Sequence, residues 1–263
     1  MGSEFSDAYD AVVAQWGVPV RRTDVDGPLA RTRVLIGGDD DAPPLLCLPG
    51  GRDTGASWFG QAATLAASHR VLAPDLPGDA GGSERRGLRS RDDLPAWIDE
   101  VLDGLGATTA DLLGYSLGAQ IAVAYALARP DRVRALTVLD PTRVFASMRI
   151  TTALRAVPVM AAPSSRRARA YATWETAGHW PPTPEFGRLA SAAADGPRPR
   201  YAVPPQPRPD DLDALRVAVL TEQERRARVT AAPMQLADLT RSAIASGCDP
   251  QALVDAVTDA ATA

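Results

Sequence analysis

The sequence predicts an α/β fold in which helices flank a mostly parallel, twisted β-sheet. Apolar runs typical of buried strands alternate with helical stretches from residue 44 to residue 139, which indicates a parallel sheet with right-handed crossovers. A serine flanked by glycines stands between one of these strands and the helix that follows it. The chain has 263 residues, 45% hydrophobic and 23% charged, so it is long enough to bury one large core.

The N-terminal part is expected to form one helix and an edge hairpin. Ser6 can cap a helix over Asp7–Trp16, whose apolar residues recur at helical spacing before Gly17 ends it. Two strands, Val18–Asp24 and Leu29–Ile36, follow on either side of a turn signal. Residues 1–5 resemble a cloning scar, and we exclude them from the predicted fold.

The buried strands and the helices between them follow from the alternation of apolar runs and helical spacing. No convincing eighth strand precedes the last helix. Strands are expected at Pro44–Leu48, Arg70–Ala73, Asp111–Leu113, Val133–Leu139 and Leu215–Leu220, and helices at Trp58–Ser68, Arg91–Leu105, Leu117–Ala128 and Pro250–Ala260.

An insertion interrupts this alternation. Between residues 142 and 210 the strand pattern stops and prolines become frequent, which predicts a small helical cap with Pro-rich connections. Residues 6–141 and 211–263 are then expected to form the core.

Composition excludes several classes of function. A net charge of −4 and a pI of about 5.3 disfavour a general nucleic-acid-binding protein, which would need a basic field. Two cysteines cannot build a disulfide framework, so we expect a cytoplasmic protein. No apolar run is long enough to span a membrane, and we expect no membrane partner. No phosphate loop, nicotinamide fingerprint or metal-ligand cluster is present, and we therefore expect a small-molecule substrate without a cofactor, in a monomer or homodimer.

The glycine-flanked serine carries the clearest chemical signal. Ser116 lies in a G-x-S-x-G sequence, where small residues permit a sharp turn that exposes the hydroxyl above the sheet. The N–H of Leu117, at the start of the following helix, suits negative charge developing on a carbonyl oxygen. The Gly50-Gly51 turn can present a second donor, the Gly51 N–H.

These motifs, with the loop Pro74–Ser83, resemble the α/β-hydrolase superfamily over residues 18–140. The stretches Trp58–Ser83 and Trp97–Gly106 are most similar to its carboxylesterase-like branch. The resemblance implies that Ser116 is the nucleophile, followed along the chain by an acid and then a histidine.

The histidine departs from this pattern. The chain has only His69, just before a strand, and His179, in the cap. His179 could fold over Ser116, whereas His69 is expected to be a surface or strand-edge residue. By the resemblance, Cys248 takes the place of the missing histidine, although a thiol is a poor general base and a structural cysteine is the alternative. A degenerate triad of this kind is similar to the group that contains the bottromycin epimerase.

The candidate acids are Asp140 and, beyond a later strand, Glu222 or Glu224.

Six arginines without an acidic residue between Pro141 and Trp174 would attract an anionic substrate, or would simply form a solvated helix face. Trp58 is a further pocket candidate, with core packing as its alternative. The candidate substrate-binding residues are Gly50, Arg52, Tyr115, Arg143, Trp174 and Trp180.

Three functions follow. The first is a non-hydrolytic enzyme (epimerase, isomerase, cyclase or lyase) that stabilises an enolate in the oxyanion hole. The second is a serine esterase, thioesterase or lactonase with an unusual base. The third is a ligand-binding protein without catalytic activity.

Overall fold

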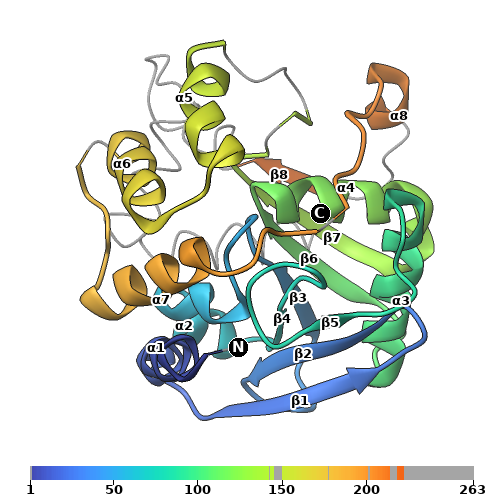
Figure 1. The fold of residues 1–263 in the computed structure, drawn as a ribbon. Coiled ribbons are helices and arrows are strands. Elements are labelled where there is room, and N and C mark those ends of the chain that lie inside the picture. The colour runs from blue at the N-terminus through green and yellow to red at the C-terminus, as the bar shows by residue number, and fades with distance from the viewer. Residues whose placement is uncertain are drawn as a thin grey trace, which may run out of the picture.

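The structure is a computed structural model, and it describes residues 2–141, 143–144, 150–176, 178–200, 202–213 and 218–221. Seven strands form one sheet in the order β1-β2-β4-β3-β6-β7-β8, and the short β5 pairs with β2 (Figure 1). β1, β2 and β4 are joined by antiparallel pairing, whereas β4, β3, β6, β7 and β8 run parallel. The predicted parallel sheet with an edge hairpin is therefore confirmed.

The strands lie close to their predicted positions. The short β5 was not predicted, because two residues are too few to show a period. The strands are β1 Val20–Asp26, β2 Ala30–Gly37, β3 Pro44–Leu48, β4 Arg70–Pro74, β5 Glu84–Arg85, β6 Ala110–Tyr115, β7 Val133–Leu139 and β8 Ala218–Thr221.

The helices cover both faces of the sheet. α3 and α4 pack on one face, whereas α1, α2 and α7 pack on the other, and α5 and α6 stand at the outer edge (Figure 1). The helices are α1 Ser3–Val13, α2 Ala62–Ala66, α3 Leu94–Gly104, α4 Leu117–Ala128, α5 Ile150–Ala161, α6 Ser165–Glu175, α7 Pro184–Asp195 and α8 Pro209–Asp213.

The first helix corrects our expectation for the N-terminus. α1 begins at Ser3, so Ser6 lies inside the helix instead of capping it, and Gly2 takes the N-cap position. Phe5 is 8% exposed and packs in the core beneath α1 and α7, so part of the segment set aside as a cloning scar belongs to the folded chain. Similarly, the helix predicted over Trp58–Ser68 is divided into a 3-10 helix over Gly55–Gly60 and the short α2.

Two apolar clusters, one on each face, hold the sheet in place. Successive strand residues point to opposite faces, so Leu46 and Leu48 join the cluster beneath α3 and α4, whereas Leu45 and Cys47 join the cluster beneath α1 and α7. Trp58 is buried and donates its indole N–H to the Cys47 carbonyl at 3.1 Å, which supports the core-packing alternative for this residue.

The predicted cap contains α5, α6 and α7, inserted between β7 and β8. A Pro-rich segment then runs from α7 across the molecule toward α8 (Figure 1). Within the described ranges, every helix is too short or too polar to cross a bilayer.

Candidate active site

Ser116 lies on a sharp turn between β6 and α4. Its backbone has φ 52° and ψ −112°, a conformation that L-residues rarely adopt and that costs about 1–3 kcal/mol. The Ser116 N–H donates to the carbonyl of Leu139 at 2.9 Å, which ties the turn to the end of β7. The half-buried serine is thus held at the carboxyl ends of the parallel strands, where such sheets usually bind ligands.

The two motif glycines are required because backbone passes close to both. A Cβ on Gly114 would lie 2.6 Å from the Cα of Ala119, in the first turn of α4. A Cβ on Gly118 would lie 2.1 Å from the carbonyl oxygen of Leu48, at the end of β3. The same packing therefore sets the angle between β6 and α4 and brings the end of β3 beside the serine.

The Gly-rich turn after β3 lies beside this serine. The Asp53 N–H closes the turn on the Gly50 carbonyl at 3.1 Å, and Arg52 has φ 66°. The Arg52 N–H donates to Asp79 Oδ2 at 2.6 Å, which anchors the turn from outside. Gly51 is exposed, so its position is compatible with the oxyanion-hole role that we predict for it and for Leu117.

The Arg52 side chain reaches the cap instead of extending freely into solvent. Its Nη2 donates to the carbonyls of Ala193 and Ala194, at 3.0 and 3.1 Å, in the last turn of α7. A guanidinium in this position stabilises the negative end of a helix. Arg52 therefore connects the turn after β3 to the cap. Its role in substrate binding stays a prediction.

Three carboxylates near this turn were not selected from the sequence. Burial, followed by the charges of Asp79 and Glu175, raises the pKa of Asp53 to about 7, against a hydrogen bond from Ser57. Burial also raises the pKa of Asp79 to about 6, against hydrogen bonds from two backbone N–H groups. Glu175 comes from the cap helix α6 and accepts a hydrogen bond from the hydroxyl of Tyr171 at 3.1 Å. A clue was available only for Asp53, which closes the Gly-rich turn.

Tyr115 connects these carboxylates to the nucleophile. A Cβ on Gly50 would lie 2.9 Å from the Tyr115 ring and 3.2 Å from Asp53 Oδ2, so only glycine fits between them. Burial raises the pKa of the Tyr115 phenol well above its usual range, and the charges of Glu175, Asp140 and Asp53 add to the effect. A neutral, half-buried phenol beside Ser116 is consistent with the substrate-binding role predicted for Tyr115.

Asp140 directly follows Leu139, whose carbonyl accepts the Ser116 N–H. It has φ 44°, is half-buried, and lies close enough to raise the pKa of Tyr115. The structure therefore brings this predicted acid to the neighbourhood of Ser116. Arg143, three residues later, is exposed and also has a positive φ of 55°.

Among the contacts of the described residues, neither histidine shows those of a triad base. His69 precedes β4, and its Nε2 lies 3.6 Å from Asp111 Oδ2 at the start of β6, so it occupies the opposite edge of the sheet from Ser116. It is 5% exposed, which makes it a buried strand-edge residue. His179 is exposed, and its Nδ1 lies 3.0 Å from the Thr176 carbonyl at the end of α6. A carbonyl only accepts hydrogen bonds, so Nδ1 carries the proton in this contact, and in the neutral imidazole Nε2 is then the acceptor nitrogen.

The cap tryptophans contact arginines. The guanidinium of Arg155 lies 4.5 Å from the ring centroid of Trp174, and that of Arg169 lies 5.3 Å from Trp180. Two of the six cap arginines therefore make cation–π contacts.

Three predicted catalytic residues, Glu222, Glu224 and Cys248, lie outside the described residues.

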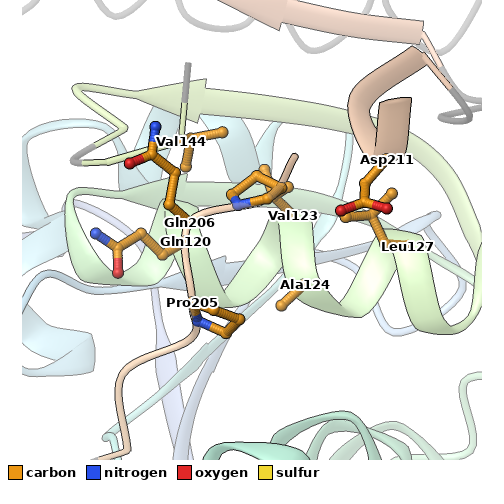
Figure 2. A pocket seen from close by; sticks show the side chains of 9 residues that line it. Gln120, Val123, Ala124, Leu127, Val144, Pro205, Gln206 and Asp211 are labelled. Carbon is orange, nitrogen blue, oxygen red and sulfur yellow. The ribbon is translucent and has the colours of Figure 1, made fainter. Parts of the chain in front are cut away.

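A pocket of about 200 Å³ runs along α4 beneath the Pro-rich segment (Figure 2). Gln120 forms the end that lies nearer to Ser116, and its backbone N–H donates to the Ser116 carbonyl. Leu127 and Asp211 form the other end. None of its lining residues belongs to the serine turn or to the turn after β3. We therefore regard it as a space between α4 and the Pro-rich segment, separate from the reacting centre.

The search for similar proteins agrees with this geometry. Residues 43–165 match the family model described as alpha/beta hydrolase fold. The chain is 31% identical to "Carboxylesterase YbfK" of Bacillus subtilis (strain 168) over 176 residues, which cover 66% of this chain and 58% of the relative. It is 28% identical to "Uncharacterized carboxylesterase nap" of the same organism over 145 residues, which cover 55% of this chain and 48% of the relative. The matches thus span about half the length of these curated relatives.

A solved structure extends the likeness in three dimensions. The crystal structure of carboxylesterase CesB (YbfK) from Bacillus subtilis superimposes with a TM-score of 0.75 at 27% identity. The match covers 82% of this chain and 78% of that one.

Proposed function

Because the chain belongs to the α/β-hydrolase superfamily, we propose that it is a carboxylesterase-type enzyme that hydrolyses small acyl esters or thioesters through Ser116. The observation that carries the proposal is the backbone of Ser116, held at φ 52° and ψ −112° between β6 and α4. A strained conformation with a reactive side chain at its apex is typical of a functional position. The carboxylesterase relatives support ester substrates.

The reaction would proceed by nucleophilic attack. Ser116 Oγ forms a bond to the acyl carbon, and the carbonyl oxygen takes up the negative charge, which the N–H groups of Gly51 and Leu117 stabilise. The serine proton passes to a base and then to the leaving alcohol or thiol. Water afterwards cleaves the acyl-enzyme. Among the described residues, Asp140 and His179 are the bases to test. Asp140 lies beside the serine turn, and the imidazole of His179 can accept a proton at Nε2 while Nδ1 donates to the Thr176 carbonyl.

Labelling and hydrolysis test this proposal together. We expect a fluorophosphonate probe to label the wild-type protein stoichiometrically, and Ser116→Ala to abolish both the labelling and the hydrolysis of p-nitrophenyl esters. Ser68→Ala is the matched control, because Ser68 lies before β4 at the opposite edge of the sheet. Asp140→Asn and His179→Ala identify the base by the variant whose kcat falls. Labelling or turnover that persists in Ser116→Ala would contradict the proposal.

The contacts of the two histidines favour a second candidate, a non-hydrolytic reaction beside a carbonyl such as epimerisation, isomerisation, cyclisation or carbon–carbon lysis. An oxyanion hole stabilises an enolate without an activated nucleophile, so this chemistry does not require a triad histidine. Exchange of a substrate's α-proton for solvent deuterium, undiminished in Ser116→Ala, would favour this candidate over hydrolysis.

A further inference from the structure

A second pocket, of about 660 Å³, is rich in arginine. It lies between the loop after β4 and the segment that follows α7. Asp79, which anchors the turn after β3, is its only acidic lining residue. The arginines that line it are Arg85, Arg86, Arg89, Arg198 and Arg200.

The two walls of this pocket are joined by specific hydrogen bonds. Arg85 donates to the carbonyls of Leu88 and Arg89 in its own loop and to the carbonyl of Arg200 across the pocket. The Arg200 N–H in turn donates to the Gly78 carbonyl at 2.6 Å. Gly78 has φ +84°, and a Cβ there would lie 2.9 Å from the Arg200 carbonyl oxygen. Two hydrogen bonds therefore hold the walls together, one between the backbones of Arg200 and Gly78 and one from the Arg85 side chain to the Arg200 carbonyl.

The positive charges of the pocket are only partly compensated. Arg86 pairs with Asp26 at 2.9 Å. The pKa of the Asp93 carboxyl is lowered, first by hydrogen bonds from the backbone N–H groups of Ser90 and Arg89 and to a smaller extent by the charge of Arg85. Within the described part of the chain, the guanidinium groups of Arg89, Arg198 and Arg200 form no ion pair. All three are exposed, and Arg198 uses one nitrogen on the Ala161 carbonyl at 3.0 Å.

Guanidinium groups bind phosphate oxygens through paired N–H donors, and several converging arginines suit a ligand with more than one phosphate charge. The pocket also adjoins the reacting centre. Asp79 lines the pocket and accepts the Arg52 N–H of the turn that carries Gly51. Through Asp79 the pocket therefore borders the turn after β3, one of the two turns assigned to the oxyanion hole.

We propose that this arginine pocket binds the phosphate-bearing end of an acyl thioester or ester substrate whose acyl group is cleaved at Ser116. The inference rests on the proposed function for the cleavage, whereas binding of phosphate in the pocket is independent of it. The enzyme would then prefer substrates that carry a phosphorylated leaving group over neutral esters of the same acyl chain.

Calorimetric titration with inorganic pyrophosphate tests the pocket on the full chain. We expect one bound pyrophosphate per chain, with an affinity that falls about tenfold in Arg89→Gln and again in Arg200→Gln, since each substitution removes one exposed guanidinium contact. Arg91→Gln is the matched control, because Arg91 is an exposed arginine two residues after Arg89, at the start of a 3-10 helix, and does not line the pocket. Absence of binding, or an equal loss in Arg91→Gln, would overturn the site.

Kinetics test the link to Ser116. For a short-chain acyl-coenzyme A, we expect Arg89→Gln to raise KM about tenfold and pyrophosphate to compete, while hydrolysis of a neutral p-nitrophenyl ester stays unchanged. If pyrophosphate binds but affects neither substrate, the pocket is a site for free phosphate and the substrate assignment fails. If neither substrate is cleaved while pyrophosphate still binds, the proposed function fails and the pocket stands as a phosphate site alone.

Discussion

Substitution of Asp53 by asparagine should make the protein more stable at alkaline pH. In the wild-type protein, burial and the charges of Asp79 and Glu175 raise the pKa of Asp53 from 3.8 to about 7. The folded state therefore binds this proton more tightly than the unfolded state does. Stability from this group is fully present below about pH 4 and is lost as the pH rises through about 7. The asparagine side chain would carry no charge and would still accept the hydrogen bond from Ser57.

The size of the expected stability difference follows from how far the pKa of Asp53 is raised. At about 1.4 kcal/mol per pH unit, a pKa raised from 3.8 to about 7 corresponds to about 4 kcal/mol in a fully dehydrated site. Asp53 is a half-buried residue, so screening reduces this upper value. We expect Asp53→Asn to gain about 1–2 kcal/mol over wild type at about pH 8 and nothing at about pH 4.

Urea unfolding of both proteins at the two pH values, followed by tryptophan fluorescence, measures this difference directly. Asp75 and Asp79 titrate in the same range, with pKa values of about 6, but they are present in both proteins and do not create the difference. Asp41→Asn is the control, since Asp41 is an exposed loop carboxylate. If Asp53→Asn loses stability equally at both pH values, the ionised carboxylate is favoured in the fold and our reasoning is wrong.

Three further substitutions probe the contacts around the site. Gly118→Ala would place a methyl group 2.1 Å from the Leu48 carbonyl, and we expect a loss of about 2 kcal/mol in thermal unfolding together with weaker fluorophosphonate labelling; unchanged labelling would contradict the close packing. Arg52→Ala removes the link to the last turn of α7, so limited proteolysis should cut the cap faster, and an unaltered rate would show that the link does not restrain it. Tyr9→Phe removes a hydroxyl that donates to buried Asp75 at 3.2 Å. We expect the free energy of unfolding in urea to fall by about 1 kcal/mol, and to fall more above pH 6, where the Asp75 carboxyl is ionised, than below it. A loss that does not depend on pH would argue against the hydrogen bond.

The strands and the serine turn could be predicted because their signals are local. A buried strand such as Pro44–Leu48 shows in five consecutive apolar or near-apolar residues, and its observed bounds match the prediction. The G-x-S-x-G motif is also a local signal, and a Cβ on Gly114 would meet Ala119 only five residues away, whereas the contact that requires Gly118 is with Leu48 in a different strand. The start of the first helix was misplaced because the burial of Phe5 depends on packing against distant parts of the chain.

The roles of individual polar residues depended on contacts between distant segments. Nothing in the sequence around Arg52 indicates that its side chain donates to the last turn of α7. Asp53 and Glu175 come from a turn after β3 and from a cap helix, and neither segment alone indicates that one carboxylate raises the pKa of the other. The arginine pocket is also formed by two segments whose basic residues look like ordinary surface charges in the sequence.

The sequence by itself determined the α/β architecture, the order of its strands along the chain and the position of Ser116, because hydrophobic periodicity and glycine geometry act over a few residues. Only the tertiary structure decided which charges face one another across the cap and the sheet. Burial and charge–charge interaction depend on distances in space, and these are created when segments far apart in the chain pack together.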